Sequence, residues 1–102
     1  MPVMSTATSD GKVVTICVSG QFNFSEYRNF RDAYQRSLTT GASNYVIDLN
    51  GTEYMDSSAL GMLLVLREQV GAENADIRII NCNAEIRKVF SIAHFDRLFR
   101  IE

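Results

Sequence analysis

The sequence contains no tryptophan, one proline, two cysteines and one histidine among 102 residues. Two cysteines without CxxC spacing and a single histidine are too few ligands for a zinc site and too few partners for a disulfide framework. Cys17 and Cys82 both lie within predicted strands, so we interpret them as buried, reduced thiols. We find no linker, internal repeat or low-complexity segment that would divide the chain.

The sequence also lacks an excess of charge of one sign and a long hydrophobic run. Ten basic against twelve acidic residues give a net charge of −2, and the scattered basic residues argue against nucleic-acid binding. The longest strongly apolar window, 59–66, is far shorter than the roughly 20 residues that cross a bilayer. The N-terminal segment has no signal-peptide pattern. With 46% hydrophobic residues, we expect one cytoplasmic domain, residues 1–102, with its own core and no membrane insertion.

The first half of the chain predicts a hairpin followed by an amphipathic helix. Residues 13–18 are mostly β-branched and predict a strand, with 4–8 as its hairpin partner across an Asp-Gly turn at 10–11. Asn23 and Glu26 have the spacing of a capping box, so a helix is expected to start directly after Asn23. Apolar positions at helical spacing form its expected buried face: Tyr27, Phe30, Ala33, Tyr34 and Leu38.

The second half predicts one βαβ unit. Residues 45–49 and 77–82 are short apolar strands, and a helix from about Ser57 to Val70, which Gly71 ends, lies between them. Such a crossover makes the two strands parallel and packs the helix on the sheet.

A further helix and a short final segment follow the βαβ unit. Asn83 is the expected N-cap, and residues 98–101 form a last extended or packing segment. The single histidine, His94, follows the helix and tolerates a positive φ, so we interpret it as a C-cap. Four apolar residues form the helical stripe: Ile86, Val89, Phe90 and Ala93.

Asp56, Ser57 and Ser58 connect the strand at 45–49 to the helix that follows it. The free N–H groups of a first helical turn and the positive end of the helix dipole stabilise an anion. A phosphate on a serine there would be held without disturbing the fold. A D-S-S run before apolar residues is also a common helix cap, and the two roles are compatible. Asp56 is expected either to cap the helix or to orient Ser57.

The helix after the serines is apolar on nearly all sides. One side must pack on the sheet, while the other is either a partner surface beside Ser57 or buried under a neighbouring helix. We expect Met62 and Val65 on the exposed side. Gly61 costs about 1 kcal/mol relative to alanine in a helix interior, so it indicates close approach of a partner or close packing on the sheet. The expected buried residues are Leu60, Leu63 and Leu66.

The order of these elements and several short motifs resemble the STAS domain, the fold of bacterial anti-sigma factor antagonists. The D-S-S-[GA]-L-G element is the most specific of these motifs, whereas each strand pattern alone is weak. The resemblance implies an α/β domain with a mixed sheet of about four strands, a parallel βαβ core and helices packed against it. The motifs are VSG at 18–20, VIDL at 46–49, MDSSALG at 55–61, IRIIN at 77–81, IRKVF at 86–90 and LFRI at 98–101.

In that family the serine directly after the aspartate accepts a phosphate, which corresponds to Ser57, with Asp56 and Ser58 in support. The resemblance implies partner switching. The unphosphorylated antagonist binds an anti-sigma factor that is also an ATP-dependent serine kinase, and phosphorylation releases it. A metal-dependent serine phosphatase then resets the switch. Gly61, Met62 and Val65 would belong to the partner surface.

The sequence predicts no enzymatic activity, cofactor or metal for the chain itself. It has no GxxxxGK[ST] loop, no GxSxG elbow, and its one imidazole, His94, lies far along the chain from the serines. A serine hydrolase is therefore disfavoured. The alternative function is a STAS subunit built permanently into a transporter or signalling scaffold, without a phosphorylation switch. Where antagonists often carry an acidic pair, this chain has QFN at 21–23, which leaves the charge of the partner open.

Overall fold

The computed structural model describes residues 2–102, apart from the side chain of Glu73. It contains one five-stranded sheet of order β1-β2-β3-β4-β5, in which β1 is antiparallel to β2 and the other neighbours are parallel. The α/β class and the mixed sheet with a parallel core are thereby confirmed, with five strands in place of about four. The strands are β1 Val3–Ala7, β2 Val13–Phe22, β3 Asn44–Met55, β4 Asp76–Ile80 and β5 Arg100–Ile101.

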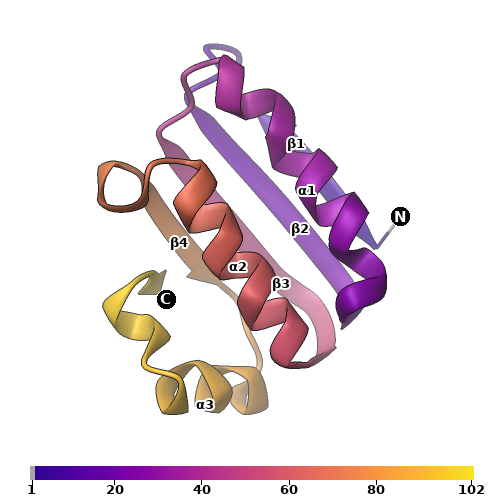
Figure 1. Ribbon diagram of the computed structural model, residues 1–102. Coiled ribbons are helices and arrows are strands. Elements are labelled where there is room, and N and C mark those ends of the chain that lie inside the picture. Colours follow the sequence, from indigo (N-terminus) through magenta and orange to yellow (C-terminus); the bar gives the residue numbers. More distant parts are fainter. Residues whose placement is uncertain (1) are drawn as a thin grey trace.

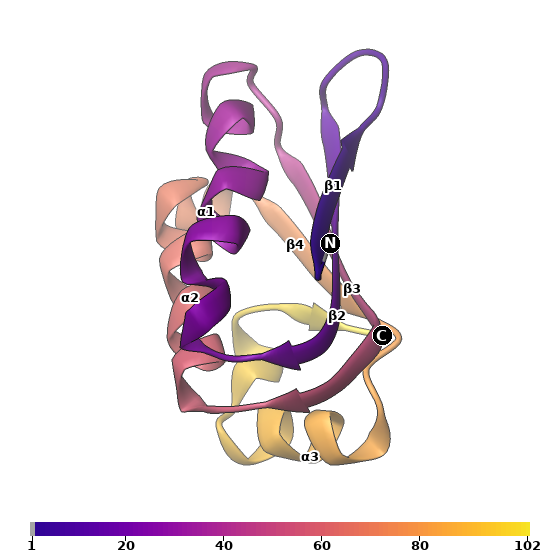
Figure 2. The ribbon, with the colours of Figure 1, turned by 90° about the vertical axis from the view of Figure 1, so that its right-hand side faces the viewer.

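Three helices connect the parallel strands, so the chain forms three successive βαβ crossovers where the sequence predicted one. Helices α1 and α2 lie side by side over one face of the sheet, and α3 lies near its lower end (Figure 1). Within residues 2–102, no helix covers the opposite face (Figure 2). The helices are α1 Tyr27–Gln35, α2 Ser57–Gln69 and α3 Ala84–Ile92, with 3₁₀ turns at Phe24–Glu26, Arg36–Thr39, Ala72–Asn74 and Phe95–Arg97.

None of the helices that the structure describes is long and apolar enough to cross a membrane.

β3 continues well beyond the predicted end at Leu49, to Met55. Two register shifts in the β2–β3 ladder each place an extra residue in β3. At Gly51 an added Cβ would lie 2.9 Å from the Cβ of Ser19, so this close pairing requires glycine. Bulges of this kind bend strands. The ends of β2 and β3 curve toward the helix layer, where α2 begins (Figure 2).

The two predicted N-cap residues, Asn23 and Asn83, both accept a hydrogen bond from a first-turn backbone N–H, but the hydrogen bonds around Asn23 differ from the prediction. Asn23 accepts a hydrogen bond from the Ser25 N–H at 3.0 Å. The Glu26 carboxylate accepts a hydrogen bond from the Asn29 side-chain amide at 3.1 Å and not from the backbone N–H of Asn23. The predicted capping box, in which the two residues cap each other, is therefore wrong. The cause is the 3₁₀ turn, whose tighter winding places Ser25 against the Asn23 side chain. Asn83 caps α3 as predicted, accepting from the Ile86 N–H at 2.8 Å.

The end of α3 agrees with its prediction. His94 adopts a left-handed conformation with φ 60° directly after the helix, which confirms its helix-ending role. The chain then turns back so that β5 pairs in parallel with β4.

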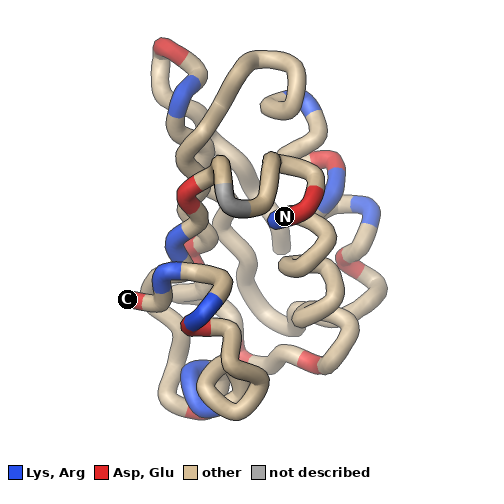
Figure 3. Tube along the Cα trace, turned by 60° about the vertical axis from the view of Figure 1, so that its left-hand side comes forward, with Lys and Arg blue, Asp and Glu red and all other residues tan. Residues whose placement is uncertain are grey.

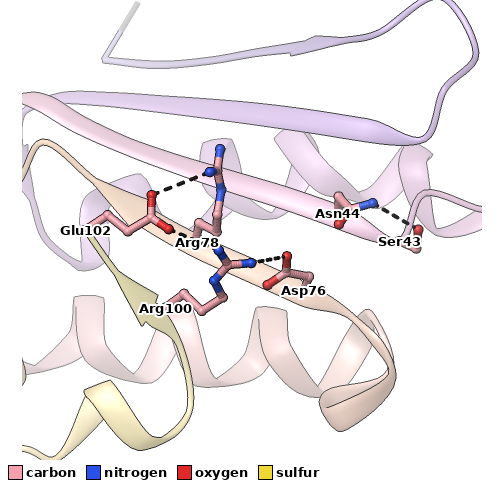
Figure 4. Close-up of polar contacts among 6 residues, drawn as sticks. All are labelled: Ser43, Asn44, Asp76, Arg78, Arg100 and Glu102. Carbon is pink, nitrogen blue, oxygen red and sulfur yellow. Dashed lines mark hydrogen bonds and ion pairs between the residues drawn. The ribbon is translucent and has the colours of Figure 1, made fainter.

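Three linked ion pairs at the β4–β5 edge of the sheet connect the two-residue strand β5 to β4. Arg100 contacts Asp76 at 2.8 Å and Glu102 at 3.3 Å, and Arg78 contacts Glu102 at 3.4 Å (Figure 4). These side chains are between 39% and 60% exposed, so each pair contributes at most about 1 kcal/mol. Charged side chains at a sheet edge also oppose pairing with other strands.

The prediction of two buried cysteines is wrong. Cys17 is exposed, and Cys82 is partly exposed just beyond β4. Side chains alternate along β2, and its buried members Val14, Ile16 and Val18 face the helices. Cys17 therefore points to the uncovered face.

Alkylation of Cys17 is expected to be slow at pH 7. Partial desolvation and, to a smaller extent, the carboxylate of Asp48 raise the pKa of its thiol, and only the thiolate is a strong nucleophile. The rate with iodoacetamide should still be rising above about pH 8.5, the ordinary thiol pKa, where the rate of an unstructured cysteine peptide begins to level off. Asp48→Asn should react faster than the wild type at equal pH. Mass spectrometry of the Cys17 peptide checks this, and alkylation at pH 7 as fast as that of an unstructured cysteine peptide would contradict it.

Candidate functional site

Asp56 is the N-cap of α2 and ties the helix start to the sheet. Its Oδ1 accepts hydrogen bonds from the backbone N–H groups of Ser58 at 3.0 Å and Ala59 at 3.2 Å. Its own N–H donates to the Phe22 carbonyl at the end of β2, at 3.3 Å. The start of α2 is therefore fixed to β2 as well as to β3, from which it emerges.

The two adjacent serines have different environments. Ser58 is half-buried, and its hydroxyl donates to the Asp56 carboxylate at 2.6 Å. Ser57 is the first residue of α2 and exposed, and within the part of the chain that the structure describes its hydroxyl has no hydrogen-bond partner. A group transferred to Ser58 would have to break a bond to a carboxylate and lie beside its negative charge. The Ser57 hydroxyl has no such bond to break within the described structure.

Asp56 remains ionised at neutral pH. The hydrogen bond from the Ser58 hydroxyl, and with it bonds from backbone N–H groups, lowers the pKa of this carboxyl against the opposing effect of desolvation. Its charge is thus directed to Ser58 and the first-turn amides. Of the two roles considered for Asp56, the capping role is observed, and the side chain contacts Ser58 instead of Ser57.

Helix α2 buries one stripe, and its other side carries the site. The buried stripe has the helical spacing i, i+3, i+4, i+7 and consists of Ala59, Met62, Leu63 and Leu66. Burial of Leu63 and Leu66 is confirmed, whereas Leu60 is only partly buried. We define the exposed stripe as Ser57, Gly61, Leu64, Val65 and Glu68.

Two of the three candidate contact residues lie on the exposed stripe. Val65 is 43% exposed, as expected, but Met62 is only 5% exposed, so its predicted exposure beside Ser57 is wrong. The physical reason is spacing, because Met62 lies one turn after Ala59 and belongs to the stripe that packs into the core. Gly61 is exposed, and an added Cβ there would meet no atom within 4 Å. Close packing on the sheet therefore does not explain this glycine.

Exposed apolar residues on α1 and in the 3₁₀ turns on either side of it were missed by sequence reasoning. Tyr27 and Leu38, assigned to the buried face, are 38% and 36% exposed, and Phe24 is 68% exposed. Phe24 stacks on Tyr27 with ring centroids 5.5 Å apart. The position of Phe24 outside the predicted apolar stripe was the only feature of the sequence that could have indicated its exposure.

The charges around the site form no strong field of one sign. Basic and acidic positions are interspersed along the trace (Figure 3). Among the residues that the structure describes, no group of three or more His, Cys, Asp or Glu side chains could hold a metal ion. The junction itself presents an exposed hydroxyl, a helix N-terminus and an apolar stripe.

A serine at the start of a helix that crosses between parallel strands, in a sheet with an antiparallel first strand, is the arrangement expected of a STAS-type domain. The family model described as "Mlab, STAS domain" matches residues 5–100, and the chain belongs to this STAS-domain family. The resemblance found from the sequence motifs is confirmed. A STAS-domain containing protein of Pseudomonas aeruginosa (strain UCBPP-PA14) is 46% identical over 101 residues, which cover 99% of each chain.

Solved structures share the fold at low sequence identity. A putative anti-sigma factor antagonist from Thermotoga maritima matches with a TM-score of 0.82 at 19% identity, covering 97% of this chain and 84% of that one. The unphosphorylated anti-sigma factor antagonist SpoIIAA matches with 0.76 at 17% identity, over 98% and 86%. The phosphorylated SpoIIAA of Bacillus matches with 0.75 at 17% identity, over 98% and 90%.

Proposed function

We propose that this protein is an anti-sigma factor antagonist that acts by partner switching in the cytoplasm. When unphosphorylated it binds an anti-sigma factor or serine kinase through the exposed stripe of α2. Phosphorylation of Ser57 releases that partner, and a serine phosphatase acting transiently restores the binding state. The observation that carries the proposal is the contrast between the two serines, because among the described residues at the helix start only Ser57 presents an exposed hydroxyl without a hydrogen-bond partner. The chain is the substrate of this chemistry and not its catalyst.

A phosphate on Ser57 is compatible with the fold. The helix N-terminus stabilises a negative charge through its dipole and first-turn N–H groups. SpoIIAA supports this expectation, since its unphosphorylated and phosphorylated structures resemble this chain almost equally, with TM-scores of 0.76 and 0.75. We therefore expect the switch to act at the surface and not through refolding.

The same phosphate is incompatible with a partner packed on the exposed stripe. It adds a charge of about −1.5 to −2 beside Gly61, Leu64 and Val65, which offer apolar surface to a partner. A partner without a basic group at this position would have to desolvate the charge, which costs affinity, and an acidic group there would be repelled. The nearby Asp56 carboxylate adds repulsion of the same sign.

Phosphorylation is expected to weaken partner binding at least tenfold, a change of about 1.4 kcal/mol, while α2 stays folded. The measurement combines titration of the partner kinase, with and without ATP, with circular dichroism and amide exchange over Ser57–Gln69. Loss of exchange protection in α2 after phosphorylation would contradict the mechanism. A complex that binds equally with and without ATP, and carries no phosphoserine, would instead support the permanent scaffold subunit.

A further inference from the structure

A groove runs between α1 and α2 on the helix-covered side of the molecule. Its volume is about 230 Å³. Val65 lies in both the groove and the exposed stripe, so the groove continues the surface that begins at Ser57. The two helices run side by side along the sheet (Figure 1), which gives the groove the direction of the helix axes. Its lining includes Tyr27, Arg31, Tyr34, Leu38, Val65 and Gln69.

The rim of the groove carries three exposed large apolar side chains, beside the polar side chains of Gln35 and Gln69. Tyr27 lies on α1, Leu38 on the 3₁₀ turn that follows it and Val65 on α2, and each is more than a third exposed. Phe24 stacks on Tyr27 and extends this surface toward the N-terminus of α1. The rim offers apolar side-chain contacts. At Gly61, where no side chain covers α2, a partner can approach the helix backbone closely. This is the form of surface that accepts the apolar face of an amphipathic helix.

One charge accompanies the apolar rim. Arg31 is the only charged side chain among those that line the groove, and its guanidinium carbon lies 5.7 Å from the Tyr27 ring centroid. Among the side chains that the structure describes, Arg31 makes no ion pair. A guanidinium held over a ring at an apolar rim is complementary to a carboxylate. A second copy of this chain would bring another Arg31 and no lining carboxylate to the contact.

We propose that the groove between α1 and α2 binds an amphipathic helix of the partner protein, with its apolar face on Tyr27, Leu38 and Val65 and a carboxylate on Arg31. The inference rests on the proposed function, because the partner is the protein that the stripe of α2 binds. It adds the chemistry of that partner, namely an acidic-rimmed helix. It also extends the contact along α2 as far as Val65, about two turns after Ser57.

The test uses two synthetic helical peptides of 18 residues, with leucine at i, i+3, i+4 and i+7 and with either glutamate or lysine on the rim. Both are titrated into the unphosphorylated ¹⁵N-labelled protein. The glutamate peptide should bind about tenfold tighter, with chemical-shift changes at Tyr27, Arg31, Leu38 and Val65. Arg31→Glu should reverse the preference. Arg28→Glu, the same change at an exposed residue of α1 outside the groove, should retain it.

Several outcomes would overturn the inference. These are no binding of the glutamate peptide, equal binding of both peptides, shifts that map elsewhere, or self-association of the protein through this groove in sedimentation. Ser57→Ala should bind the glutamate peptide as the wild type does. Failure of the peptide test therefore leaves the phosphorylation proposal standing, and failure of phosphorylation leaves the peptide result standing.

Discussion

Ser57→Ala is expected to abolish phosphorylation by the cognate kinase, whereas Ser58→Ala should retain most of it. The Ser58 hydroxyl donates to the Asp56 carboxylate at 2.6 Å, while the Ser57 hydroxyl is exposed and has no such bond in the described structure. Incubation with kinase and ATP should therefore add one phosphate. Intact-mass measurement gives the number of phosphates, and tandem mass spectrometry of the peptide spanning 55–67 gives the position.

Asp56→Ala provides the control for this selectivity. It removes the carboxylate that holds the Ser58 hydroxyl, so some phosphate should appear on Ser58, along with a lower melting temperature from the lost cap. Asp56→Asn keeps an acceptor oxygen, so it should cause less phosphorylation of Ser58 and a smaller fall in the melting temperature than Asp56→Ala. A phosphate on Ser58 in the wild type, or undiminished labelling of Ser57→Ala, would overturn the assignment of Ser57.

Lysine at Met62 or Leu63 is expected to unfold the domain, while lysine at Val65 should leave it folded and weaken partner binding. Met62 and Leu63 are 5% and 0% exposed, and burying a charge without a partner costs several kcal/mol, a large part of a typical stability of about 5–15 kcal/mol. Val65 is 43% exposed, so its lysine remains in water. A central contact charged in this way commonly costs at least about 1–2 kcal/mol of binding, roughly tenfold in affinity.

Urea denaturation alongside a binding titration with the partner kinase separates the two classes of variant. Ser91→Lys, on the exposed side of α3, is the matched control and should change neither stability nor binding. If Val65→Lys unfolds like the core variants, the structure of α2 is wrong at this position. If Val65→Lys stays folded and binds normally, the partner surface lies elsewhere.

Local patterns in the sequence were sufficient to predict those helix ends and strands that depend mainly on the preferences of neighbouring residues. The helix predicted from about Ser57 to Val70 is observed as Ser57–Gln69, because a D-S-S cap and a following glycine define both ends. The β-branched run at 13–18 lies within β2. Asn83 and His94 have the predicted cap roles because their side-chain and backbone preferences are local.

Tertiary context decided the remaining features. β5 has two residues and forms only because β4 is available beside it, so no local pattern marks it as a strand. β3 extends through an Asn-Gly pair at 50–51, which is typical of a turn, because β2 supplies a partner beyond it. The orientation of α2 could not be read from residues that are apolar on nearly all sides. Its packing against the sheet placed Met62 in the core and Val65 at the surface.

The bond between Asp56 and Ser58 has a consequence for any enzyme that acts on this helix start. Two neighbouring hydroxyls with similar local sequence would ordinarily have to be distinguished by the kinase. In the proposed switch, the chain itself excludes one of them before the encounter, since the Ser58 proton is already bonded to the Asp56 carboxylate. A kinase that recognises only the backbone around the helix start could therefore modify a single position. Fidelity at this junction becomes a property of the folded substrate, and it is lost whenever the cap opens.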